Sequence, residues 1–270
     1  MTKIAVLQLP TLALSEARLD YYLKVCKDNG VSLILLGEYV LNSFFKELEN
    51  MPISMIKKQS EDRKESLINL AKKYDITIIA PLVLVRGKDI YKVIAKISQS
   101  QTKFYEQQFL MQYSHWNEAK FFKNEFKDKL NYSTFKFDDL KFGVMFGYEA
   151  HFDASFVYMM KKNVDVLLIP TACTFETNER WCELLKMRAF TNNVYILRAN
   201  RIGHYKNKNI DESWNFYGDS MLISPFGEVS QRLGSNEEMM ISNLDKKEII
   251  TARGIWGFKN EINKKKLLSL

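Results

Sequence analysis

Short apolar runs separated by amphipathic segments constrain the fold of this chain more than any other feature of its sequence. Residues 4–9 and 31–36 are predominantly apolar, and residues 16–29 between them repeat apolar side chains at helical spacing. A strand, a helix and a second strand within about 35 residues form the repeating unit of an α/β protein. The beginning of the chain therefore predicts an α/β fold.

The same alternation continues along the rest of the chain. Helices are predicted at residues 61–74, 151–163 and 178–192, and strands at residues 76–85, 90–97, 103–109, 135–137, 140–146, 164–169, 194–200, 219–223, 228–231 and 240–244. Residues 111–128 are aromatic and charged, and we expect a long functional loop with a helical turn there, and a polar tail after residue 244. Since no Gly/Ser-rich or Pro-rich linker interrupts this order, residues 1–270 are predicted to form one domain.

The composition is that of an ordinary globular protein and argues against two classes of partner. Hydrophobic residues make up 46% of the 270 residues and aromatic residues 13%, which is ample for a substantial core. The formal net charge is +7, but Lys and Glu are interleaved along most of the chain and only residues 264–266 form a compact basic run. We therefore expect no nucleic-acid partner. Since no segment approaches the roughly 20 apolar residues that span a bilayer, we also expect no membrane association.

The cysteines and histidines favour a reducing compartment and no bound metal. Three cysteines are an odd number, and they show no CxxC spacing, so neither a disulfide framework nor a structural zinc site is indicated. The three histidines lie far apart in sequence and lack metal-ligand spacing. We therefore expect a cytoplasmic protein without a metal ion.

One apolar stretch stands out as a candidate functional site. The run at residues 141–146 stops abruptly at Gly147, and the next residues include Tyr148, Glu149 and His151, which are of kinds that bind ligands. A buried strand commonly delivers a functional group to a pocket in this way. The residue at the delivery point, however, is a glycine, which has no functional group.

Three further residues could take part in chemistry. Glu38 follows an apolar strand, so its carboxylate could be tuned towards general-base catalysis, although a lone glutamate is more often a solvated loop residue. Glu118 lies in an aromatic segment and is a further candidate carboxylate. Cys173, close after a predicted strand, could be an exposed thiol or simply a small residue that lines a cavity.

Eight segments, in their order along the chain, resemble the nitrilase superfamily of carbon-nitrogen hydrolases, and the resemblance extends over essentially the whole length. These segments are residues 4–8, 35–38, 105–122, 143–149, 169–172, 188–193, 195–203 and 218–227. The resemblance implies a single-domain, four-layer α-β-β-α sandwich that forms homodimers or larger homo-oligomers, with residues 251–270 as a C-terminal tail at the oligomer contacts. It also implies that no cofactor is needed.

The resemblance also assigns roles to residues of this chain. The family uses a glutamate as general base, a lysine that stabilises the developing charge and a cysteine nucleophile. Glu38 occupies the glutamate position, but Gln107 stands at the lysine position and Gly147 at the cysteine position. Glu118 corresponds to an auxiliary glutamate, and Tyr148, Glu149 and Cys173 are expected in the pocket. Two of three catalytic positions are therefore substituted.

Three hypotheses follow for the function. The first is a pseudoenzyme that retains a pocket for a small amide, nitrile or amine-type ligand, since a glycine cannot form an acyl-enzyme. The second is an active hydrolase of small amides or N-carbamoyl compounds that uses Glu38 with a displaced nucleophile such as Cys173. The third is a non-catalytic scaffold or partner subunit whose pocket has collapsed.

Overall fold

The chain folds into two six-stranded sheets that pack face to face. The computed structural model describes residues 1–12, 15–125, 128–207 and 212–265. The first sheet has the order β14 (Glu238–Leu244), β1 (Thr2–Gln8), β2 (Leu33–Leu36), β3 (Thr77–Arg86), β4 (Asp89–Ile97), β5 (Thr102–Glu106). The second has the order β13 (Val229–Arg232), β12 (Met221–Ile223), β9 (Tyr195–Asn200), β8 (Val166–Thr171), β7 (Leu140–Val144), β6 (Ser133–Phe137).

The central strands of each sheet are buried on both faces. In β1, Ile4 and Val6 contribute to the apolar layer between the two sheets, whereas Ala5 and Leu7 contribute to a separate core on the other face. Successive side chains of a strand point to opposite faces, so a strand covered on both sides must be apolar throughout. This is the reason that these strands appear in the sequence as continuous apolar runs.

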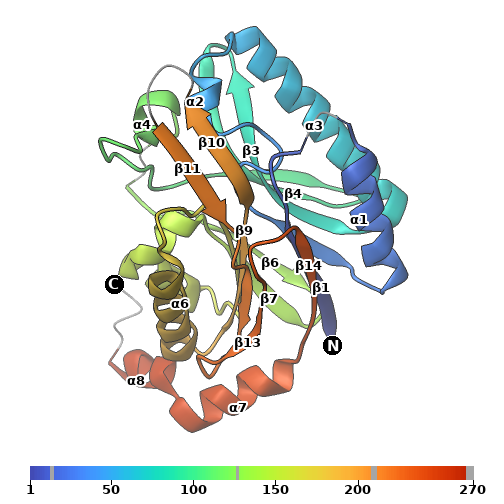
Figure 1. Ribbon diagram of the computed structural model, residues 1–270. Helices are drawn as coiled ribbons and strands as arrows, with labels where there is room; N and C mark the ends of the chain where they lie inside the picture. Colours follow the sequence, from blue (N-terminus) through green and yellow to red (C-terminus); the bar gives the residue numbers. More distant parts are fainter. Residues whose placement is uncertain (13–14, 126–127, 208–211, 266–270) are drawn as a thin grey trace.

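Helices cover the two outer faces. Helices α1 (Ala17–Asp28) and α3 (Ile53–Tyr74) contribute apolar residues to the outer core of the first sheet, and α5 (Asp153–Lys161) and α6 (Asn178–Asn192) do the same for the second. Figure 1 shows α1 and α3 on one side of the molecule and α6 on the opposite side. The predicted single-domain α-β-β-α sandwich is therefore confirmed.

Short elements cluster at one end of the sandwich. They are α2 (Phe45–Leu48), α4 (Glu118–Phe121), the 3-10 helix η1 (Gly147–His151) and the separate hairpin of β10 (Ile202–Asn207) and β11 (Glu212–Tyr217). An aromatic cluster joins this hairpin to α2 and the loop before α4, because Phe44, Trp116 and Trp214 pack together there. The predicted helical turn within residues 111–128 is confirmed as α4, and residues 126–127 lie outside the described part.

Two predictions of secondary structure were wrong. The residues after Leu244 are not a simple polar tail, since α7 (Lys246–Trp256) and α8 (Phe258–Lys264) follow, and Ile249 and Ala252 of α7 are fully buried. Helix α3 begins at Ile53, well before the predicted start at residue 61. In both segments few apolar residues face the core, so helical periodicity is weak in the sequence although tertiary contacts stabilise a helix.

Among the described residues, no helix combines the length and the apolar character that a membrane span requires.

Candidate functional site

The carboxyl ends of strands from both sheets meet at Glu38. This residue follows β2, and its backbone N–H donates to the carbonyl oxygen of Thr171 at the end of β8, 3.1 Å away. Gly37 permits this close approach, because a Cβ at residue 37 would lie 3.0 Å from the backbone nitrogen of Arg201. Residues at the carboxyl ends of parallel strands from both sheets thus surround one point, where α/β proteins commonly bind ligands.

A cavity of about 300 Å³ opens at this point. Glu38, Gly147, Thr171 and Cys173 are buried residues that line it. Its walls are largely aromatic and are formed by Tyr113, His115, Trp116, Tyr148, His151, Phe152, Phe175 and Trp181. The cavity is at the small end of the range that holds small-molecule ligands, and the predicted pocket residues Tyr148 and Cys173 both line it.

A buried lysine that sequence reasoning missed stands beside Glu38. The Lys92 Nζ atom lies 2.5 Å from Glu38 Oε2 and 2.6 Å from Glu118 Oε1. The Tyr39 hydroxyl donates a hydrogen bond to the same Glu118 oxygen at 2.8 Å. All four side chains are nearly inaccessible to solvent. Glu38 and Glu118 therefore belong to one site, as predicted. Lys92 of β4, which was not predicted, bridges them.

The environment of this cluster determines its charges. Burial raises the pKa of Glu38, and the positive charge of Lys92 lowers it by less. Burial lowers the pKa of Lys92, but the negative charges of Glu118 and Glu38 together raise it by more. Lys92 is accordingly an ammonium group at neutral pH, paired with two carboxyl groups. The sequence contains a faint signal for this role, since a lysine within the otherwise apolar middle of a strand needs a buried partner.

Gln107 lies next to Lys92 but faces elsewhere. Its backbone N–H donates to the Lys92 carbonyl oxygen at 3.1 Å, and its side-chain Nε2 donates to the Phe109 carbonyl oxygen at 2.6 Å. Gln107 does not line the cavity, and its Oε1 atom is buried without a hydrogen-bond partner among the described residues. The ammonium group beside Glu38 therefore comes from Lys92 of β4 and not from residue 107, where the resemblance placed the lysine.

The protein packs closely around Gly147. A Cβ atom at residue 147 would lie 2.5 Å from the Thr171 Cγ2 methyl and 3.3 Å from the Pro170 carbonyl oxygen. Rotation of the Thr171 side chain is restrained, because its Oγ1 donates to Asn200 Oδ1 at 2.9 Å and accepts from Arg198 Nε at 3.2 Å. The Thr171 methyl thus occupies space that any side chain at residue 147 would need.

Cys173 is the one cysteine among the described residues that line this cavity. Its backbone N–H donates to Asn200 Oδ1 at 2.8 Å, and it is 8% exposed. Burial raises the pKa of the Cys173 thiol, while the nearby Arg198 guanidinium lowers it by less. The interpretation as a small buried cavity-lining residue therefore fits better than that of an exposed thiol.

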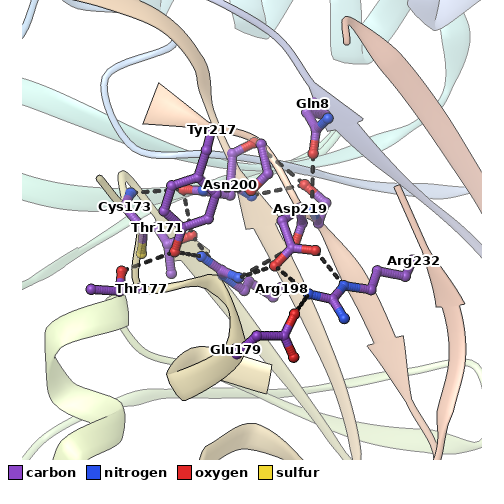
Figure 2. Close-up of polar contacts among 12 residues, drawn as sticks. Gln8, Thr171, Cys173, Thr177, Glu179, Arg198, Asn200, Tyr217, Asp219 and Arg232 are labelled. Carbon is purple, nitrogen blue, oxygen red and sulfur yellow. Dashed lines mark hydrogen bonds and ion pairs between the residues drawn. The ribbon is translucent and has the colours of Figure 1, made fainter. Parts of the chain in front are cut away.

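A polar network behind Cys173 centres on the fully buried Arg198, as Figure 2 shows. Arg198 Nη2 donates to the Tyr217 hydroxyl at 3.2 Å, and Nη1 donates to the Asp219 carbonyl oxygen at 3.2 Å. The Asp219 carboxylate also accepts from Arg232 Nε at 2.5 Å. Arg198 and Arg232 therefore share the Asp219 carboxylate, and neither arginine lines the cavity.

Glu149 was predicted in the pocket, but it does not line the cavity. Its carboxylate accepts hydrogen bonds from the backbone N–H groups of Gln108 at 2.5 Å, Phe109 at 3.2 Å and Phe146 at 2.8 Å. Glu149 thereby joins the start of η1 to the loop after β5. Burial raises the pKa of Glu149 to about 8, because it outweighs the three N–H donors, which lower it.

The raised pKa of Glu149 predicts that stability falls as pH increases. The ordinary pKa is 4.5, so between pH 4.5 and about 8 the unfolded chain loses this proton while the folded chain keeps it. The free energy of unfolding should therefore decrease through this window, by on the order of a few kcal/mol. Urea unfolding of the wild type and of Glu149→Gln at several pH values measures this. Parallel pH profiles of the two proteins would contradict the prediction, since the variant lacks the titrating group.

Among the described residues, no group of three or more His, Cys, Asp or Glu side chains is arranged to hold a metal ion.

Comparison with known proteins identifies the family. The sequence profile of the carbon-nitrogen hydrolases matches residues 3–253. The chain belongs to the carbon-nitrogen hydrolase family.

Its curated relatives include the deaminated glutathione amidase of Dictyostelium discoideum, 30% identical over 115 residues, which are 42% of this chain and 38% of that protein. The omega-amidase NIT2 of Xenopus tropicalis is 30% identical over 116 residues, which are 43% of this chain and 40% of that protein. The chain thus matches less than half the length of these relatives.

Solved structures extend the likeness over the whole fold. A carbon-nitrogen hydrolase from Helicobacter pylori G27 superimposes with a TM-score of 0.84 at 18% identity, covering 95% of this chain and 94% of that one. Saccharomyces cerevisiae Nit3, a member of branch 10 of the nitrilase superfamily, superimposes with a TM-score of 0.74 at 20% identity, covering 94% of each chain. These structures confirm the nitrilase-like sandwich.

Proposed function

We propose that this member of the carbon-nitrogen hydrolase family binds a small molecule in the cavity beside Glu38 without forming a covalent intermediate and without hydrolysing it. The observation that carries the proposal is the contact between the Thr171 methyl and the position that a Cβ at residue 147 would occupy. The glycine is accommodated by its surroundings, since its neighbours fill the space of the missing side chain.

The charged groups of the cavity support retained binding. Glu38, Lys92 and Glu118 are all buried, and burial of charges costs free energy that apolar residues of similar size would avoid. The cavity is nonetheless open, and Glu38 and Thr171 line it. A collapsed pocket, which the scaffold hypothesis requires, would be filled by side chains, so the open cavity counts against that hypothesis.

Intact-mass measurement tests the absence of a covalent step. Wild-type protein incubated with an activated amide, such as p-nitroacetanilide, is expected to keep its unmodified mass and to release no p-nitroaniline above the rate of the buffer. A stoichiometric acyl adduct would contradict the proposal. Cys173→Ala serves as the matched control, because it removes the cavity thiol and leaves Glu38, Lys92 and Gly147 in place.

The second candidate function is hydrolysis with Cys173 as a displaced nucleophile. The observation in its favour is that Cys173 and Glu38 line the same cavity. Against it, burial raises the pKa of the thiol, and the Glu38 carboxyl group is already paired with Lys92. An acyl adduct that forms on the wild type and disappears in Cys173→Ala would favour this function over the first.

A further inference from the structure

The charged residues that line the cavity do not favour an acidic ligand. Among its lining residues in the described part of the chain, Glu38 is the one acidic side chain, and there is no Lys or Arg. Arg198 stands behind Cys173 without lining the cavity, and the Asp219 carboxylate lies 3.4 Å from its guanidinium. A ligand carboxylate or phosphate would therefore meet no lysine or arginine side chain in the lining of this cavity, and its desolvation would be costly.

The cluster behind Glu38 adds to this negative character. Lys92 is shared between two carboxyl groups, so when both are ionised the three side chains carry a net charge of −1. Glu118 also accepts a hydrogen bond from Tyr39 and does not line the cavity, so Glu38 is the carboxyl group of this cluster that lines it. An additional positive charge placed against Glu38 would balance the cluster.

The walls of the cavity suit a positive charge as well. Tyr148 and Trp116 line it, together with Tyr113 and Phe175. Faces of aromatic rings attract ammonium groups, and the attraction is stronger in a desolvated site than at a surface. The same rings can pack against an aliphatic chain attached to the ammonium group.

We propose that the ligand of this cavity is a primary amine in its ammonium form, bound with the ammonium group against Glu38 and its hydrocarbon part among the aromatic walls. This inference rests on the proposed function, and it names the ligand class from the charges in the lining of the cavity and the chemistry of its walls.

A series of five-carbon ligands with different end groups tests the inference at pH 8. Pentylammonium, pentan-1-ol, pentanamide and pentanoate have similar hydrocarbon parts, so titration followed by protein NMR or calorimetry isolates the end group. We expect pentylammonium to bind at least about tenfold more tightly than the alcohol or the amide, and pentanoate to bind most weakly. Equal binding of the ammonium and the alcohol, or tighter binding of the amide or the carboxylate, would overturn the inference.

Two variants locate the preference within the cavity. Glu38→Gln should abolish the advantage of pentylammonium over pentan-1-ol, so that the two affinities come within about twofold of each other, because it removes charge and conserves shape. Glu183→Gln is the matched control, since that glutamate is exposed on α6 and pairs with Lys186 outside the cavity. A preference that survives Glu38→Gln in folded protein would also overturn the inference.

The series separates this inference from the proposed function. Ammonia released from pentanamide would contradict the proposed function, whatever the order of affinities. A stable, unhydrolysed complex with pentanamide that is tighter than the one with pentylammonium would contradict only the ligand class.

Discussion

The double variant Gly147→Cys/Thr171→Ser is expected to gain amide hydrolysis that the wild type lacks. Cysteine introduces the nucleophile of the family, and serine removes the Thr171 methyl that a Cβ at residue 147 would contact at 2.5 Å. Serine keeps the hydroxyl that donates to Asn200 and accepts from Arg198. Loss of a nucleophile commonly removes about 10⁶ of the rate, so recovery of even about 10² would be readily measured as ammonia release from a panel of small amides.

Gly147→Cys by itself is expected to show much less of this gain. The single variant keeps the methyl contact, so either the Thr171 side chain breaks its hydrogen bonds or the new thiol is displaced from its best position, and displacement of about 1 Å can cost about 10² in rate. Gly147→Ala/Thr171→Ser is the control that has the same packing without a thiol. Equal activity of the single and double cysteine variants would show that the Thr171 methyl does not restrict the site.

The same experiment decides whether Lys92 can replace the lysine expected at residue 107. Lys92 already places an ammonium group beside Glu38, whereas the side chain of Gln107 is directed to the Phe109 carbonyl oxygen. We expect that adding Gln107→Lys to the double variant does not increase hydrolysis further. A large additional gain would show that the position of Lys92 is unsuited to stabilise the charge that develops on the substrate.

Replacing Lys92 by methionine is expected to destabilise the protein by about 3–5 kcal/mol at pH 7. The change conserves most of the volume but leaves Glu38 and Glu118 buried close to each other without the cation that they share. Repulsion by Glu118 should then raise the pKa of Glu38 further, so the loss of stability should shrink at pH 5, where protonation of Glu38 removes one of the charges. Chemical unfolding in urea at both pH values measures the effect.

Two further variants check the origin of this loss. Lys96→Met alters another lysine of β4, whose ammonium lies 4.8 Å from the centre of the Phe135 ring, and it should cost less than about 1 kcal/mol. Adding Glu38→Gln and Glu118→Gln to Lys92→Met should recover much of the lost stability, because no buried charge then remains in the cluster. If the triple variant is as unstable as Lys92→Met, the loss arises from packing and not from unpaired charge.

The apolar periodicity of the sequence was sufficient to predict most of the helices and strands. The predicted helix at residues 178–192 coincides with α6, and every predicted strand overlaps an observed one. These elements are buried on one or both faces, so their apolar periodicity is strong. The hairpin of β10 and β11 was not predicted, because many of its residues are polar and partly exposed.

The sequence by itself determined that residue 147 offers no side chain and that Glu38 follows a buried strand. These are local properties, which depend on the residue type and on the apolar run before it. Only the tertiary structure decided that Lys92 stands beside Glu38, that the Thr171 methyl takes the space at Gly147, and that Glu149 binds backbone N–H groups outside the cavity. Each of these contacts joins residues of different strands or loops, and periodicity specifies the face on which a side chain lies but not the partner that it meets there.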